Sequence, residues 1–225
     1  MCSLALNILG QIRGKVKSKQ KSQMFISPVR RSARILKNLQ PVAATVEVTA
    51  VIENDRIDIL EIAGYGPRMG SGIRARIKIA PGTWLTTYRG KLMTEEEGLN
   101  AEKDAAHNAV TECYMFYFRD IFQQNKPMMC CDATEADGSF GRLINHKANN
   151  INIKPHLTNY KGKTHIVFQC YRTIFAGEQL TYNYGERRKE VVKANPWLKY
   201  DSVNPQPNST TNNDTFMDKW VNRLP

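Results

Sequence analysis

The chain has 225 residues, of which 41% are apolar, and its 32 Lys and Arg against 21 Asp and Glu give a formal net charge of +11. This length allows one sizeable domain with flanking tails or two small domains, and no apolar run approaches the roughly 18 residues that a transmembrane helix needs. Five sparse, irregularly spaced cysteines indicate reduced thiols in the cytosol or nucleus rather than a disulfide framework.

Positive charge is concentrated at the start of the chain. Residues 1–40 contain nine Lys and Arg and no Asp or Glu, whereas the rest of the chain carries 23 basic against 21 acidic side chains. Such a polycation suits nucleic acid, an acidic protein surface or a membrane face. A solvated tail that only aids solubility and a mitochondrial presequence are the alternatives. We predict that residues 1–43 form a disordered basic tail, because they are polar and contain two prolines.

The first half of the remaining chain reads as strands followed by a helix. Residues 44–62 are rich in Val and Ile, and the alternation in VEVTAVI predicts a strand. After a glycine-rich loop, IRARIKI alternates apolar and basic residues and predicts a half-buried strand over 73–79. An APG turn then makes TWLTTY, residues 83–88, its expected hairpin partner. Thr94 and Glu97 fit a capping box and predict a helix in the residues that follow.

The second half adds further short strands and one short helix. Strands are predicted for the apolar runs CYMFYF (113–118), MMCCDA (128–133), HIVFQCYRTI (165–174) and LTYNY (180–184). ERRKEVVKANPWL predicts a short helix that stops at Pro196. Residues 201–225 are rich in Asn, Thr and Pro and predict a disordered polar tail. Many short strands with two helices indicate one mainly β domain over 44–200 rather than an alternating βαβ fold.

The glycine loop GYGPRMGSG, residues 64–72, does not fit a dinucleotide-binding fingerprint. Gly70 comes one residue late, Pro67 interrupts the motif, and a strand rather than a helix follows. A loop that lets the backbone approach a ligand and a plain turn both stay open. The chain has no CxxC and no HxxxH, so we predict no metal site.

GRLINH, residues 141–146, is an unusual place for two polar residues. Asn145 and His146 follow an apolar pair, and neither is a comfortable core residue. Aromatic residues end several predicted elements: Tyr88, Tyr114, Tyr117, Tyr182, Tyr184 and Trp197. Any one of these rings could simply pack in the core, but together with Asn145 and His146 they suggest a site.

GRLINH, followed about 35 residues later by GEQLTYNYG, resembles the two signature segments of the SET-domain protein lysine methyltransferases. CYMFYF, CDAT, YNYGERR, NPWLKY and the early PVRRSAR resemble most closely the branch that monomethylates histone H4 lysine-20, and the resemblance spans residues 28–200. It implies a mainly β SET-domain fold of the β-clip type with short helices. In that fold the two signature segments cross in a pseudoknot, beside a site for S-adenosylmethionine and a narrow lysine channel.

The resemblance also implies roles for individual residues of this chain. Tyr184 is the expected main catalytic tyrosine, with Tyr182 and Tyr88 beside it, and a tyrosine at position 182 favours the transfer of one methyl. Cys113 and Tyr117 are expected to line the lysine channel. The expected cofactor-binding residues are Gly70, Gly72, Tyr114, Arg142, Asn145, His146 and Trp197, with Trp197 packing on the adenine.

The function implied is transfer of one methyl from S-adenosylmethionine to histone H4 lysine-20 on nucleosomes, in the nucleus and on chromosomes. The expected partners are the nucleosome and the H4 tail, with Arg30, Arg31 and Arg34 contacting DNA or the acidic histone surface. We expect a monomer and no membrane association. A SET-fold chromatin-binding module without activity and a SET methyltransferase of a non-histone protein remain the alternatives.

Overall fold

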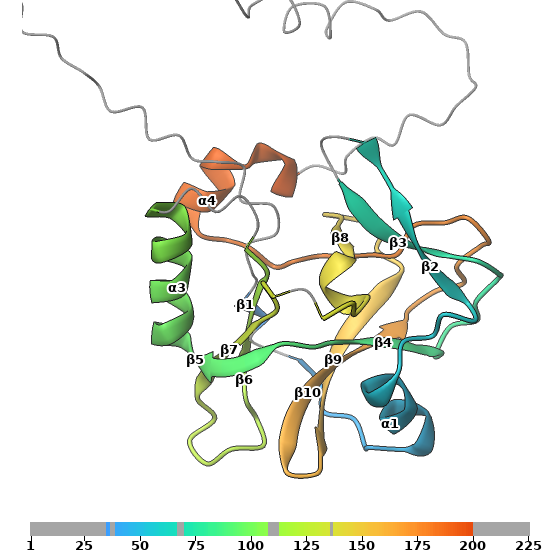
Figure 1. The fold of residues 1–225 in the computed structure, drawn as a ribbon, viewed down its shortest axis with the longest axis horizontal. Helices are drawn as coiled ribbons and strands as arrows, with labels where there is room; N and C mark the ends of the chain where they lie inside the picture. Colours follow the sequence, from blue (N-terminus) through green and yellow to red (C-terminus); the bar gives the residue numbers. More distant parts are fainter. Residues whose placement is uncertain (1–34, 37–38, 67–69, 108–112, 136, 200–225) are drawn as a thin grey trace, which may run out of the picture.

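The structure is a computed structural model. The described residues are 35–36, 39–66, 70–107, 113–135 and 137–199 (Figure 1). The basic segment with Arg30, Arg31 and Arg34 and the polar segment 201–225 lie outside them. The described chain forms several small sheets with short helices around them, so the predicted mainly β architecture is confirmed. No helix in this part of the chain is long and apolar enough to cross a membrane.

The strand predicted within residues 44–62 is wrong over VEVTAVIE, which forms helix α1 (Val46–Glu53). The hydroxyl of Thr45 accepts a hydrogen bond from the Val48 N–H at 3.4 Å and caps the first turn. Val48, Val51 and Ile52 are buried at helical spacing and pack with Val167. Burial of this helical face outweighs the strand preference of Val and Ile.

The predicted hairpin between IRARIKI and TWLTTY is also wrong. β3 (Ser71–Ala75) pairs antiparallel with β2 (Leu60–Gly64), not with β4 (Trp84–Tyr88). β3 ends before Ile77, which is 51% exposed, so the alternation in the sequence continues beyond the strand. Local alternation therefore identified two strands but not their partners.

β4 instead joins a sheet with the order β4-β10-β9. β10 (Lys163–Cys170) pairs antiparallel with β4 on one side and with β9 (Ile153–Tyr160) on the other. The sequence reading did not identify β9, whose residues IKPHLTNY are mostly polar and include Pro155. Because β9 is an edge strand of this sheet, it tolerates the proline.

A second sheet, of order β1-β6-β7-β5, contains the predicted strands CYMFYF and MMCCDA. Its strands are β1 (Ile35–Leu36), β5 (Lys91–Thr94), β6 (Met115–Arg119) and β7 (Met128–Asp132). Leu36 and Leu39 pack against the main core, whereas the sequence placed the start of the domain at residue 44.

Helix α3 (Glu95–His107) begins with the predicted capping box, which is confirmed. The Glu97 carboxylate accepts hydrogen bonds from the N–H and hydroxyl of Thr94 at 2.8 and 2.9 Å, and the Glu97 N–H donates back to the Thr94 hydroxyl. Gly98 lets the helix approach β7, because a Cβ there would lie only 2.7 Å from the Cys130 sulfur.

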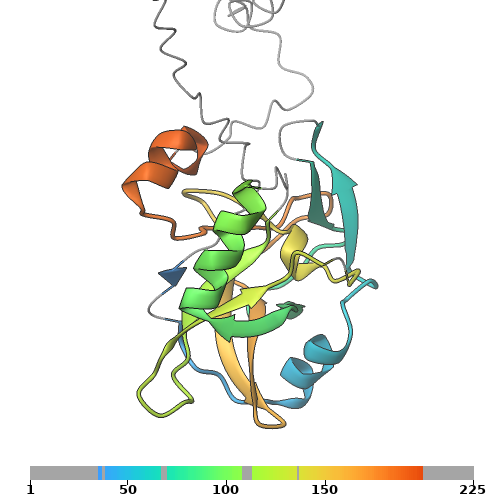
Figure 2. The ribbon, with the colours of Figure 1, turned by 60° about the vertical axis from the view of Figure 1, so that its left-hand side comes forward.

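The remaining short elements lie after β7. They are the 3₁₀ helix η1 (Gly141–Leu143), β8 (Asn145–His146), β11 (Thr181–Tyr182), α4 (Lys189–Ala194) and the 3₁₀ helix η2 (Pro196–Leu198). The helix predicted to stop at Pro196 is confirmed. In Figures 1 and 2, α4 lies near one end of α3, and the β2–β3 hairpin lies on the other side of the molecule.

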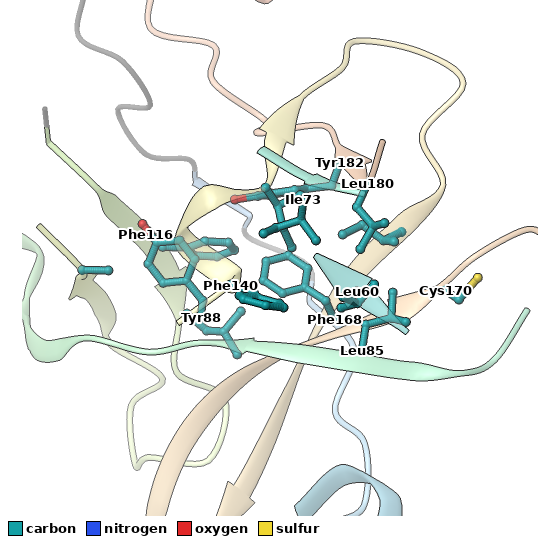
Figure 3. Packing of buried hydrophobic residues seen from close by; sticks show 14 of the residues in the cluster. Leu60, Ile73, Leu85, Tyr88, Phe116, Phe140, Phe168, Cys170, Leu180 and Tyr182 are labelled. Carbon is teal, nitrogen blue, oxygen red and sulfur yellow. The ribbon is translucent and has the colours of Figure 1, made fainter. Parts of the chain in front are cut away.

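The main core lies between these sheets and is rich in aromatic rings (Figure 3). Phe116, Phe140, Phe168 and Tyr182 converge on aliphatic side chains from β2, β3 and β4. The four described cysteines, Cys113, Cys130, Cys131 and Cys170, are buried and form no disulfide. Burial, with the charges of Asp132 and Glu102, raises the pKa of the Cys130 thiol to about 12. Cys131 and Cys170 pack in the main core, and Cys113 and Cys130 pack in a second cluster.

Candidate functional site

The two unusual segments of the sequence, GRLINH and GEQLTYNYG, lie side by side. β8 pairs parallel with β11, so Asn145 faces Thr181 and His146 faces Tyr182. Asn152, which is 1% exposed, holds the second segment in place. Its side-chain oxygen accepts the Thr181 N–H at 2.8 Å, and its amide nitrogen donates to the Gln179 carbonyl at 2.7 Å. Asn152 was not among the predicted residues, and its role depends on contacts across 29 residues of sequence.

His146 connects three separate parts of the chain. Its Nδ1 accepts a hydrogen bond from the Tyr184 N–H at 3.0 Å, and its Nε2 lies 3.1 Å from the Leu198 carbonyl oxygen. Because Nδ1 accepts, the ring hydrogen of the neutral imidazole is on Nε2, which donates to Leu198. The edge of the Trp197 ring meets the same imidazole at a centroid distance of 5.7 Å. His146 thus ties the end of η2 to the paired segments.

The predicted tyrosines form a buried aromatic wall next to this histidine. Tyr182 and Tyr184 are 2% and 1% exposed, and their ring centroids lie 4.8 Å apart. The Tyr184 hydroxyl donates to the Ile144 carbonyl at 2.7 Å, which fixes its orientation. Phe116 lies between Tyr88 and Tyr182, at centroid distances of 5.2 and 6.2 Å. The structure therefore brings Tyr88, Tyr182 and Tyr184 into one cluster.

Gly72 lies in close contact with the side chains of Asn145, Gln179 and Tyr65, which together are called the Gly72 cradle. A Cβ at this position would lie 2.5 Å from the Asn145 amide nitrogen, 2.7 Å from the Gln179 amide nitrogen and 2.8 Å from the Tyr65 ring. The Tyr65 hydroxyl and the Gln179 amide nitrogen are buried without a hydrogen-bond partner. Burial raises the pKa of Tyr65 to about 12, so its phenol stays protonated. Tyr65 and Gln179 were not predicted, although both belong to the quoted motifs.

Gly70 precedes Gly72 in the sequence, and its backbone conformation favours glycine. Its φ is +61°, in the left-handed region that favours glycine. Its N–H donates to the Gly66 carbonyl at 2.8 Å, and its own carbonyl accepts the Tyr65 N–H at 2.8 Å. The expected positions Gly70 and Gly72 therefore have separate physical requirements, a turn and a close approach.

Arg142 and Tyr114 contact each other at the end of β7. The Arg142 guanidinium lies 4.3 Å above the Tyr114 ring, a cation–π geometry. Its Nη1 donates to the carbonyls of Ala133 and Thr134 at 2.7 and 3.0 Å. Arg142 therefore links the start of GRLINH to the residues directly after β7.

The two residues expected in the lysine channel, Cys113 and Tyr117, lie in a second cluster. They pack with Met115 and Cys130, on the side of β6 that faces α3. Side chains alternate along β6, so Phe116 and Phe118 point instead into the main core. The structure therefore does not bring Tyr117 into the cluster of Tyr182. Burial and the charge of Glu102 raise the pKa of the Tyr117 phenol, whose oxygen is buried without a hydrogen-bond partner.

Asp55, which the sequence reading did not single out, fixes where GRLINH begins. Its side chain is 8% exposed and forms an ion pair with Arg89 at 2.7 Å. The same carboxylate accepts the Phe140 N–H at 3.0 Å and the Thr86 hydroxyl. Asp55 thus joins the segment after α1 to the end of β4 and to the residue before η1.

We expect Asp55→Asn to lower the free energy of unfolding by about 2 kcal/mol, because a buried charge-assisted network loses its charge. Asp58→Asn is the matched control: Asp58 pairs with Arg56 at 2.7 Å, but its side chain is 58% exposed. Surface pairs of this kind contribute little. Urea unfolding of both variants checks this, and an equal loss in the two would contradict the role given to Asp55.

Comparisons with known proteins match the chain to one family. The sequence profile of the SET domain matches residues 70–185. "N-lysine methyltransferase KMT5A-B" of Xenopus laevis is 34% identical over 173 residues, 76% of this chain and 49% of the relative. "Histone-lysine N-methyltransferase Set8" of Drosophila melanogaster is 34% identical over 174 residues, 77% of this chain and 24% of the relative. The crystal structure of CpSET8 from Cryptosporidium is 30% identical, with a TM-score of 0.49 over 57% of this chain and 58% of that chain.

This chain spans about half or less of the length of the two curated relatives named above. The family match covers about half of the chain and includes both paired segments, Gly72 with its neighbours Asn145 and Gln179, and the aromatic wall. The chain therefore belongs to the SET-domain family.

Proposed function

We propose that this protein is a protein-lysine N-methyltransferase that uses S-adenosylmethionine. The observation that carries the proposal is the parallel pairing of β8 with β11, which sets Tyr182 and Tyr184 next to Asn145 and His146. Asn145 and His146, which can bind a cofactor, thus lie next to the rings of Tyr182 and Tyr184, which can hold a lysine. The names of the relatives, both lysine methyltransferases, support the same activity.

The residues around Gly72 fit such a cofactor. The space that a Cβ would fill is lined by the amides of Asn145 and Gln179, and the unpartnered Tyr65 hydroxyl and Gln179 nitrogen can bond to a polar ligand. Trp197 is 42% exposed, so its ring offers a surface on which adenine can stack. When bound, S-adenosylmethionine supplies an electrophilic methyl group on a sulfonium centre.

The aromatic wall would prepare the lysine to react. A lysine amine must lose its proton to attack a methyl group, yet its ordinary pKa is about 10.4. Burial among Tyr88, Tyr182 and Tyr184 disfavours the ammonium and increases the share of neutral amine. Because Tyr184 is oriented by its bond to Ile144, its oxygen can accept a hydrogen bond from the amine and direct it. Positioning and desolvation would then supply most of the catalysis.

The finer proposal is that the substrate is histone H4 lysine-20 on nucleosomes and that one methyl is added. It is supported by the branch-specific motifs from PVRRSAR to NPWLKY. The name of the Drosophila relative supports a histone lysine as the substrate. The basic segment with Arg30, Arg31 and Arg34 would contact DNA or the acidic histone surface. The protein would then work in the nucleus, on chromosomes.

Tyr182→Phe should convert the product from one methyl to two. The expected reason is space and hydrogen bonding: the Tyr182 hydroxyl would hold a water where a second methyl would otherwise sit. Mass spectrometry of the product peptide at long reaction times checks this. A variant that still stops at one methyl would rule out this role for Tyr182.

The proposal is tested by a methyl-transfer assay on recombinant nucleosomes and on free histones at two salt concentrations, with Tyr184→Phe as the inactive control. The expected result is one methyl on H4 lysine-20, more on nucleosomes than on free histones, and less at high salt. Cofactor binding without methylation of any histone would point to a non-histone substrate. Absence of cofactor binding would leave a chromatin-binding module as the better description.

A further inference from the structure

Arg188, directly before α4, joins two carboxylates from distant parts of the chain. Its Nη1 lies 3.3 Å from Oε2 of Glu102 on α3. Its Nη2 lies 2.7 Å from Oε2 of Glu186 and its Nε lies 3.1 Å from Oε1, a two-point contact. The side chain of Glu186 is 1% exposed, that of Glu102 17% and that of Arg188 28%. These three residues therefore form a largely buried ion triad, not a surface pair.

The triad keeps Arg188 charged. Burial works against the charge, but the hydrogen bond to Glu186 and the charge of Glu102 outweigh it and raise the pKa of the guanidinium above its ordinary value. Removing one member of such a group leaves a buried charge without its partner. Loss of Arg188 would leave two glutamates close together in a poorly solvated place. We therefore expect the segment around Arg188 to depend strongly on this side chain.

The segment that follows Arg188, residues 189–198, carries two of the contacts to His146. The Val192 N–H donates to the Arg188 carbonyl at 3.0 Å, so the triad lies at the start of α4. At the other end of the segment, the Leu198 carbonyl bonds to His146 and the Trp197 ring packs on it. Figures 1 and 2 both place α4 next to one end of α3, the helix that supplies Glu102.

We propose that Arg188 is a positioning residue whose ion pair with Glu102 holds residues 189–198 against α3, and so keeps Trp197 and Leu198 on His146. The functional half of this proposal rests on the proposed function, because it treats His146 and Trp197 as the cofactor side of the site. The neighbouring Arg187 is exposed and forms no ion pair within the described residues. The two consecutive arginines thus differ, and Arg187 is a matched control.

Hydrogen exchange of the full chain without cofactor tests the structural half. In Arg188→Ala, the amides of residues 189–195, 197 and 198 should exchange about tenfold faster, which corresponds to about 1.4 kcal/mol of local opening free energy. Glu102→Gln should act in the same direction. Arg188→Lys should restore part of the protection, because an ammonium can form an ion pair but cannot form the two-point contact with the Glu186 carboxylate. Arg187→Ala and the β9–β10 amides should not change. Equal exchange of residues 189–198 in Arg188→Ala and the unmodified protein would overturn the proposal.

Calorimetry with S-adenosylmethionine tests the functional half. Arg188→Ala should raise the Kd about tenfold, and Arg187→Ala should leave it unchanged. Faster exchange with an unchanged Kd would show that the triad does not position the cofactor side, which overturns the functional half. If the unmodified protein does not bind the cofactor, the proposed function fails, and hydrogen exchange still decides whether Arg188 holds the segment.

Discussion

Gly141→Ala should destabilise the protein by about 3 kcal/mol, because the new Cβ would meet backbone that cannot move aside. A Cβ at Gly141 would overlap the carbonyl oxygen of Thr87, and it would lie 2.7 Å from the Thr87 carbonyl carbon and 2.9 Å from the Tyr88 Cα. Thr87 and Tyr88 belong to β4, a strand paired to β10 along its length. To relieve the overlap, either β4 or the start of GRLINH must shift, and both are packed in the core.

Urea unfolding measures this effect, with Gly64→Ala as the matched control. Gly64 ends β2, but a Cβ there would have no heavy atom within 4 Å, and its φ is not in the left-handed region. The control should change stability by no more than about 0.5 kcal/mol. If the two variants unfold at the same urea concentration, Gly141 does not lie as close to the β4 backbone as the structure shows.

Gly72→Ala should weaken S-adenosylmethionine binding about 100-fold while destabilising the fold only slightly. Its Cβ would meet the amide ends of Asn145 and Gln179 and the ring of Tyr65, rather than backbone. Side-chain ends can swing aside at little energetic cost, so the fold should survive. The displaced amides can then no longer bond to the cofactor, and losing two such bonds of about 1.5 kcal/mol each accounts for the factor.

Calorimetry and urea unfolding of the same variant separate these two effects. The expected pattern is the reverse of that for Gly141→Ala: a large loss of affinity with a small loss of stability. Gly64→Ala, in the same β2–β3 hairpin, should bind the cofactor as the unmodified protein does. Unchanged affinity in Gly72→Ala, together with measurable binding by the unmodified protein, would mean that the cradle does not face the cofactor.

Local sequence chemistry predicted several elements correctly. The capping box of Thr94 and Glu97 starts α3, and the helix of ERRKEVVKANPWL stops before Pro196. These predictions succeeded because a cap or a proline acts within one helical turn. The strand prediction for VEVTAVIE was wrong, because it rested on the alternation in VEVTAVI and on its Val and Ile content, whereas Val48, Val51 and Ile52 stand at helical spacing.

The arrangement of the candidate site was only partly predictable from the sequence. Asn145, His146, Tyr182 and Tyr184 were identified through their motifs, and β8 and β11 do bring these four together. Tyr117 belongs to the same kind of aromatic run, but the alternation along β6 turns it toward α3. Gln179 lies within a quoted motif, yet nothing in the motif says that its amide reaches Gly72.

The amino-acid sequence alone was enough to predict the class of fold and the helix boundaries near caps and prolines, and to single out the two segments that β8 and β11 pair. Only the tertiary structure decided that β4 pairs with β10, that Asp55 holds Phe140, and that Arg188 rather than Arg187 reaches Glu102. The reason is physical. Caps, turns and alternation are set by neighbours within a few residues. Asp55 and Phe140, by contrast, are 85 residues apart and Arg188 and Glu102 are 86 apart, so these partners are chosen by which surfaces the whole chain can bury together.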